Sequence, residues 1–324
     1  MLPNFPRWTR SRRAGRVTER GGCAQANGPG GDLRMDEPVG RPLTWLGAAL
    51  IAGLLTACSA AGPSADASAN AAAQTSGAPS QVSPQIVHEL APSGTLRAAI
   101  NYGNPILATR DASTGELHGI SVDLSRELAR ELGVPVQFVP YPAARKVVEG
   151  APKGEWDVAF VGIDAKRAED MLYTAPYVII EGVYMVRTNS PYRSNNDIDQ
   201  AGVRVAVSGG SAYDLFLSRE LHNATLVRVP DPSIVTATML KQSLDVVAGV
   251  KQRNEADAVR FGGLRLLPGD FMVIRQAMAT PNGRPEGVQF LRSFIERMKA
   301  SGFVAKSLQD NGINGAGVAP PAAS

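Results

Sequence analysis

Residues 120–139, ISVDLSRELARELGVPVQFV, decide the fold class of this chain. Apolar side chains recur there at four-residue steps, at Ile120, Leu124, Leu128 and Leu132. This spacing predicts an amphipathic helix, with Ser121 and Asp123 as candidates to cap its first turn. The Gly-Val-Pro that follows stops the helix, and the apolar residues 136–139 then predict a strand.

Strand and helix alternate on both sides of this stretch. Apolar patterns predict a strand at 96–100, a short helix at 146–150 and a buried strand at 156–161. A second series follows, and its predicted elements are a strand at 203–207, a helix at 212–220, a strand at 225–229, a helix at 234–241 and a strand at 245–250. A last helix, with an apolar stripe over 291–298, ends at Gly302. The chain is therefore predicted to be α/β, with mostly parallel sheets in two lobes and a cleft between them.

The N-terminal region has the features of an export signal. Residues 43–57, LTWLGAALIAGLLTA, form an apolar run too short to span about 30 Å of hydrocarbon, but they suit the core of a signal peptide. The run ends in Leu-Thr-Ala-Cys, which resembles the bacterial lipobox, so we expect Cys58 to be lipidated and to become the mature N-terminus. Residues 1–57 are thus predicted to be a leader, and 1–34 are interpreted as an over-extended start.

Two further segments are poor in core residues. From 58 to 87 the chain is mostly Ala, Ser, Gly, Pro and Gln, which predicts a flexible tether behind the lipidated cysteine. Residues 311–324 are predicted to be a flexible tail. Because Cys23 lies in the leader and Cys58 carries lipid, the folded part has no disulfide, and we expect it to be a monomer.

The charge distribution argues against a nucleic-acid partner. The chain has 33 basic and 30 acidic residues, but eight arginines and only four acidic residues lie in 1–57. The remaining 25 basic and 26 acidic residues give the folded part no basic surplus that would attract a polyanion.

Several motifs of the folded part, taken in order, resemble those of a known family. They are GTLR at 94–97, Pro105, GELHGISVDL at 115–124, LGVPVQFV at 132–139, GEWDVA at 154–159, KRA at 166–168, YTAPY at 173–177, GVRVAV at 202–207 and GSA at 210–212. Their order and spacing resemble the bacterial extracellular solute-binding proteins of the polar amino-acid type, over about residues 93–308. The resemblance implies a two-lobed fold of the type II periplasmic-binding class.

The resemblance also implies a domain organisation and a function. Lobe 1 would comprise residues 88–189 and 271–310, and lobe 2 residues 190–270. Such a protein binds a small polar solute, an amino acid or a related organic acid, between its lobes and delivers it to an ABC permease in the inner membrane. It uses no cofactor, and the lipid would hold the exported protein at the membrane surface.

Ligand-binding residues are implied in lobe 1 as well. Arg167 falls where family members hold a ligand carboxylate, and its planar guanidinium suits a bidentate oxyanion; the alternative is a surface arginine. Gly162 stands where the family usually has Ser or Thr, so only its backbone is available. Asp164 can take a ligand ammonium or cap the helix that carries Arg167.

In lobe 2, Ser211 matches a position where the family has a ligand-contacting Ser or Thr. It precedes a predicted helix, whose N-terminal amides and a hydroxyl can cradle an anion, and ordinary N-capping by Ser211 is compatible with that role. Tyr213, in the first turn of the helix, can stack on a ligand or pack between elements.

One departure from the family pattern bears on the ligand. Polar amino-acid binders have an Asp near Val250, which grips the α-ammonium, and a valine cannot do so. Lys251 is basic, and Arg145 lies in a region where the family has an aromatic residue. These cations favour an acidic ligand, although both can equally be solvated surface charges. Asn104, in the loop after the first strand, is a further polar candidate.

Other functions find less support in the sequence. His88, His118 and His222 lack the spacing of metal ligands, and there is no phosphate-loop or nucleophile motif and no free thiol. One alternative is an enzyme of the cyclohexadienyl dehydratase kind on the same fold, with Asp164 or Glu181 as its acid or base. Another is a ligand-sensing partner of a membrane receptor, which would use the same binding physics.

Overall fold

In the computed structural model, the amphipathic helix predicted from the sequence is α2 (Ile120–Leu132). Gly133 ends it in the left-handed conformation, at φ 68°, as the sequence predicts. The start differs from the prediction, because the N-cap is Gly119 and no side chain caps the first turn. A Cβ at Gly119 would lie 2.5 Å from a carbonyl oxygen of the preceding loop, and its φ is 124°, so only glycine fits. The expected caps, Ser121 and Asp123, are therefore not used.

The structure describes residues 82–323, which belong to the unit Gln74–Ser324. The predicted leader, Cys58 and the tether as far as residue 81 lie outside the described residues. Within the described part, no helix combines the length and the apolar character needed to cross a membrane.

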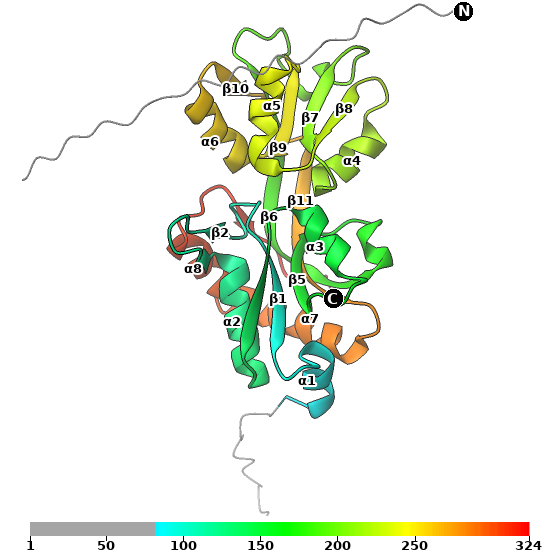
Figure 1. Cartoon of the computed structure of the whole chain (residues 1–324), viewed down its shortest axis with the longest axis vertical. Coiled ribbons are helices and arrows are strands. Elements are labelled where there is room, and N and C mark those ends of the chain that lie inside the picture. Colours follow the sequence, from blue (N-terminus) through cyan, green and yellow to red (C-terminus); the bar gives the residue numbers. More distant parts are fainter. Residues whose placement is uncertain (1–81, 324) are drawn as a thin grey trace, which may run out of the picture. The chain divides into compact units, whose positions relative to one another are not determined.

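Lobe 1 is an α/β layer structure around three parallel strands in the order β4-β1-β5 (Figure 1). Its strands are β1 (Leu96–Asn101), β4 (Val136–Tyr141) and β5 (Val158–Gly162), with a small hairpin of β2 (Thr109–Arg110) and β3 (Leu117–His118). Its helices are α1 (Pro84–Leu90), α2, α3 (Ala144–Gly150), α7 (Pro285–Ala300) and α8 (Phe303–Asp310), with a 3-10 turn η1 (Arg167–Glu169).

Lobe 2 repeats this plan with three parallel strands in the order β9-β7-β8. Its strands are β7 (Arg204–Ser208), β8 (Thr225–Val229), β9 (Val246–Val250) and the short β10 (Leu264–Leu266). Its helices are α4 (Ala212–Glu220), α5 (Val235–Lys241) and α6 (Lys251–Phe261), with 3-10 turns η2 (Asn195–Asp197) and η3 (Pro232–Ile234).

Two long strands join the lobes into one continuous sheet. The 17-residue β6 (Met171–Arg187) pairs antiparallel with β11 (Met272–Pro281) as far as Gly182, and with β9 from Gly182 onward. Strand β11 in turn pairs antiparallel with β5 of lobe 1. Figure 1 shows both strands running through the waist between the lobes. The two strands therefore connect the lobes, at the place where hinges of two-lobed proteins lie.

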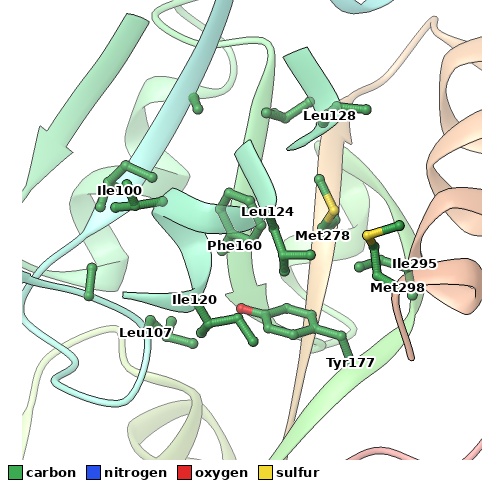
Figure 2. Close-up of a cluster of buried hydrophobic side chains, with 14 of the residues drawn as sticks. Ile100, Leu107, Ile120, Leu124, Leu128, Phe160, Tyr177, Met278, Ile295 and Met298 are labelled. Atoms are coloured by element: carbon green, nitrogen blue, oxygen red, sulfur yellow. The ribbon is translucent and has the colours of Figure 1, made fainter. Parts of the chain in front are cut away.

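Each lobe buries both faces of its sheet, as parallel strands require. In lobe 1, Leu96, Ala98 and Ile100 of β1 face α2 and α7, whereas Ala99 faces the core beneath α3. Figure 2 shows the first of these cores, where the stripe of α2 meets Phe160 of β5 and side chains of β6, β11 and α7. In lobe 2, alternate residues of β7 likewise pack against α4 and α5. The continuous apolar runs of these strands follow from this burial.

Both ends of the described chain are more ordered than the sequence predicts. Helix α1 begins at Pro84, inside the segment expected to be tether, because Ser83 caps it and Leu90 is fully buried. The expected flexible tail contains β12 (Gly317–Val318), which pairs with β6, and Ala319 is buried. The tail has few core residues, and its main-chain hydrogen bonds hold it to lobe 1.

Candidate functional site

A pocket of about 50 Å³ lies between the lobes, at the carboxyl ends of β1, β5, β7 and β9. Ligands in open α/β sheets bind at such strand ends. Lobe 1 and β11 contribute Asn101, Gly103, Asn104, Ala143, Ala144, Val161, Gly162, Arg167, Ile274 and Gln276, and lobe 2 contributes Ser208, Ser211, Ala212, Tyr213, Pro232 and Val250. The lining therefore comes from both lobes. It consists of apolar and uncharged polar residues and one cation, Arg167.

Arg167 is the only ionic residue of this lining within the described chain, and it is buried, with 3% of its surface exposed. Its Nη1 donates to the carbonyl of Gly162 at 2.9 Å, and its Nη2 donates across the cleft to the carbonyl of Gly210 at 2.8 Å. Its Nε has no hydrogen-bond partner among residues 82–323. Burial lowers the pKa of Arg167 from its ordinary value, but a guanidinium stays charged at neutral pH.

The local chain holds Arg167 in place. Strand β5 is buried along its whole length and ends at Gly162, so the loop that follows leaves the sheet at the cleft. The short η1 turn then directs Arg167 back toward the end of β5. A Cβ at Gly162 would lie 3.2 Å from Cβ of Ala212 in lobe 2. Glycine at this position thus allows the lobes to approach closely.

Three carboxamides line the lobe 1 side of the pocket. Oδ1 of Asn101 accepts from the amide of Gly103, and Oδ1 of Asn104 accepts from the amide of Ile106, so each side chain is fixed and keeps an NH₂ group as donor. Gln276 on β11 is 4% exposed, and its Oε1 has no hydrogen-bond partner in the described part of the chain. A buried amide oxygen without a partner costs about 1–3 kcal/mol, which a ligand donor can remove.

On the lobe 2 side, Ser211 lines the pocket and is also the N-cap of α4. Its Oγ accepts from the amide of Asp214 at 3.0 Å, so the capping role is present. The carboxylate of Asp214 accepts from the amide of Gly210 at 2.7 Å and pairs with Arg228. A carboxylate of the chain itself thus occupies part of the anion cradle expected at this helix N-terminus. The Ser211 hydroxyl is left as a donor.

Two residues predicted for the site do not line the pocket. Asp164 accepts from the amide of Lys166 and pairs with Arg219 of lobe 2 at 3.1 Å, so its carboxylate is turned away from the pocket. Arg145 pairs with Glu149 one turn later on α3. The stem of Arg145 packs against Gly210, where a Cβ would lie within 3.1 Å of three of its carbons. Both residues therefore contact the opposite lobe beside the pocket.

Tyr213 and Val250 lie on the lobe 2 wall. Tyr213 also borders a second small pocket behind it, under α5 and α6. Val250 is the last residue of β9 and the N-cap of α6, and its side chain makes no capping bond. Lys251 pairs with Glu181 of β6 at 2.6 Å, so neither residue is in the lining. In the described residues there is no cluster of metal ligands.

Gln276, Asn101 and Ser208 line the pocket but were not predicted from the sequence. Gln276 belongs to a strand that was not predicted. Like Ile274 and Met278, which are both buried, it stands at every second position of that strand. A lone polar residue on the buried face of an alternating strand is the signal that could have found it. Asn101 and Ser208 are the last residues of β1 and β7, where binding side chains of α/β folds gather.

Comparisons with known proteins agree with this architecture. The family model for bacterial extracellular solute-binding proteins, family 3, matches residues 96–311, and no curated protein matches the sequence. A mutant of ArgBP from T. maritima is 21% identical with a TM-score of 0.61, over 69% of this chain and 98% of its own. AbpA from Streptococcus pneumoniae, an amino acid ABC transporter substrate-binding protein bound to L-arginine, is 21% identical with a TM-score of 0.60, over 68% and 96%.

A third structure is an ancestral amino acid-binding protein described as a precursor of cyclohexadienyl dehydratase, 21% identical with a TM-score of 0.59, over 69% of this chain and 98% of its own. At such identities, likeness to these structures shows the fold alone. The family match covers two thirds of the chain and includes both lobes. The chain therefore belongs to the bacterial extracellular solute-binding proteins of family 3.

Proposed function

We propose that this chain is the substrate-binding lipoprotein of an ABC importer and that it holds a small carboxylate-bearing solute between its lobes. The observation that supports this most directly is Arg167, a buried cation that lines the pocket with an unpartnered Nε. A buried charge is stable only when it is paired or neutralised, and a carboxylate matches a guanidinium in shape and charge. Solved relatives carry L-arginine or lysine, and both ligands have a carboxylate.

Direct contacts across the cleft support a receptor that closes on its ligand. Arg167 donates to Gly210 of lobe 2, and Asp164 pairs with Arg219, so two groups next to the pocket join the lobes. Closure about β6 and β11 would bury the ligand and bring both lobes into the arrangement that a permease in the inner membrane recognises. The same closure would serve a ligand-sensing receptor, and the partner distinguishes the two roles.

An enzyme of the dehydratase kind needs an acid or base at the substrate. Among the described residues, neither Asp164 nor Glu181 lines the pocket, and each is paired with a cation, Arg219 and Lys251 respectively. This favours a binding protein over the enzyme alternative.

A ligand screen tests the proposed function. At a concentration of about 100 Kd a true ligand should raise the free energy of unfolding by about 2.7 kcal/mol. We expect members of a panel of amino acids, hydroxy acids, dicarboxylates and aromatic acids to raise the thermal midpoint of residues 82–324, with neutral amides of the same acids as controls. A panel in which no carboxylate stabilises the protein would contradict the proposal.

The lipid anchor is tested separately. Replacing Cys58 with serine removes the only thiol that the lipobox-like sequence offers for lipidation, so we expect the variant to appear in the soluble periplasmic fraction. The wild-type protein should partition with membranes, and both proteins should bind ligand equally. Membrane association that is unchanged in the variant would show that the chain is held in another way.

A further inference from the structure

The pocket has an unbalanced charge. Arg167 is its one cation, and no Asp or Glu is among the lining residues given above for the described chain. The other polar groups are uncharged amides and hydroxyls: Asn101, Asn104, Gln276, Ser208, Ser211 and Tyr213. A ligand with a net charge of −1 would balance Arg167, because opposite charges in a site of low dielectric attract strongly.

The carboxylates around the pocket have cations of their own. The pairs are Asp164 with Arg219 at 3.1 Å, Asp214 with Arg228 at 2.9 Å, Asp257 with Arg253 at 3.4 Å, Glu149 with Arg145 at 2.6 Å and Glu181 with Lys251 at 2.6 Å. Tyr173 lies close enough to Arg167 for the charge of the guanidinium to act on its phenol. Burial nevertheless raises the pKa of Tyr173 to about 12, so the phenol is neutral. The charge of Asp164 also acts on Arg167 and favours its charged form. Each carboxylate of this set therefore lies within 3.4 Å of a cation of the protein, and none is free to pair with a ligand ammonium.

The ammonium of an α-amino acid would therefore enter this pocket as a second positive charge. An uncharged amide oxygen can accept a hydrogen bond from an ammonium, but only a carboxylate would offset the desolvation of that charge. A hydroxyl makes the same hydrogen bond without a charge. The unpartnered Oε1 of Gln276 is a buried acceptor for such a donor.

The volume of the pocket limits the length of the ligand's carbon skeleton. At about 50 Å³, the pocket in this arrangement is a third of the volume of about 150 Å³ that admits benzene in an engineered apolar cavity. The apolar wall made by Val161, Val250 and Ile274 suits a short carbon skeleton. Resting on the function proposed above, we propose that the pocket selects short hydroxy acids over the α-amino acids of the same skeleton.

Matched pairs of compounds test this selection in the wild-type protein. The pairs are glycolate and glycine, L-lactate and L-alanine, and D-glycerate and D-serine, titrated by calorimetry at pH 7. We expect at least one hydroxy acid to bind about tenfold or more tightly than its amino acid partner, because the partner adds an unpaired buried charge. Equal or tighter binding of the amino acid in every pair would overturn the inference, as would the absence of binding by all three hydroxy acids.

A Val250→Asp variant tests the cause of the selection. Val250 lines the pocket and is the N-cap of α6, a position where Asp is a favoured residue, so the fold should accept the change. The added carboxylate should shift the ratio of the two affinities by about tenfold or more toward the amino acid. Val250→Asn has the same shape and capping ability as Val250→Asp but no charge, so it should shift the ratio much less than Val250→Asp does. If both variants keep the wild-type ratio while their unfolding midpoints match the wild type, the charge argument is wrong.

The two proposals fail differently. Binding of amino acids in preference to hydroxy acids would leave the proposed function intact and would overturn only the selection. If no carboxylate of the wider panel bound, the proposed function would fail first, and the selection would fail with it.

Discussion

An Arg167→Ala variant is expected to bind the carboxylate ligand about 30- to 4,000-fold more weakly than the wild type. Truncating one partner of a buried charge pair costs about 2–5 kcal/mol, largely because the other charge is left desolvated and unpaired. Arg167 meets this condition, since it is 3% exposed and is the one cation of the lining in the described chain. Calorimetry with whichever carboxylate gives the largest thermal shift measures the loss.

Two further variants serve as controls. Lys251→Ala removes a nearby positive charge that is paired with Glu181 outside the pocket. It should weaken the free energy of ligand binding by about 1 kcal/mol or less. Arg167→Lys keeps the charge but loses the planar fork, so its affinity should lie between those of the wild type and the alanine variant. If Arg167→Ala bound within about threefold of the wild type, the carboxylate would have to be held elsewhere, by Arg145 or by the Ser211 end of α4.

The sequence predicted the local elements of the fold better than the element that joins them. The predicted bounds of α2, α4 and β8 match those of the structure, because apolar spacing and terminal residues act within a few residues. The 17-residue β6 was missed. It contains Pro176, has bulges opposite β11 and changes partner at Gly182, so no single alternation runs through it. Such a strand is defined by partners far away in the chain, such as Val318 of β12, which pairs with Val178.

The site residues were likewise predicted only in part. Arg167, Ser211, Gly162, Asn104 and Tyr213 were named from the sequence, and the structure places all five in one pocket. Asp164 and Arg145 are beside the pocket rather than in it. The ion pair of Asp164 with Arg219 in the other lobe depends on how the lobes meet, which no local pattern encodes.

Each lobe has an aspartate that accepts a hydrogen bond from the amide of a neighbouring strand, at an equivalent position. In lobe 1, the amide of Arg97 at the start of β1 donates to Asp157 at 3.0 Å, just before β5. In lobe 2, the amide of Arg204 at the start of β7 donates to Asp245 at 2.9 Å, just before β9. The geometry is the same, but the surroundings differ. Asp157 is fully buried, whereas the side chain of Asp245 is 31% exposed.

Asp157, the buried aspartate, also accepts more hydrogen bonds than Asp245 does. Besides the amide, Nε and Nη2 of Arg97 donate to Asp157 at 2.9 and 2.8 Å, and Nη2 of Arg284 donates at 3.1 Å from the start of α7. The hydrogen bond from Arg97 to Asp157 raises the pKa of the guanidinium. Asp157 therefore joins β1, β5 and the segment that returns from lobe 2.

Asp157→Ala is accordingly expected to lower the free energy of unfolding by about 3–5 kcal/mol, the range found when a buried ion pair loses one member. Asp245→Ala removes the equivalent carboxylate from a partly exposed site, and it should cost about 1 kcal/mol or less. Urea denaturation of residues 82–324 measures both, and unchanged m-values would show that the unfolding transition itself is the same. Equal losses in the two variants would mean that the shared bond to the strand amide carries the stabilisation. A loss confined to Asp157→Ala would instead assign it to burial and to the two arginines.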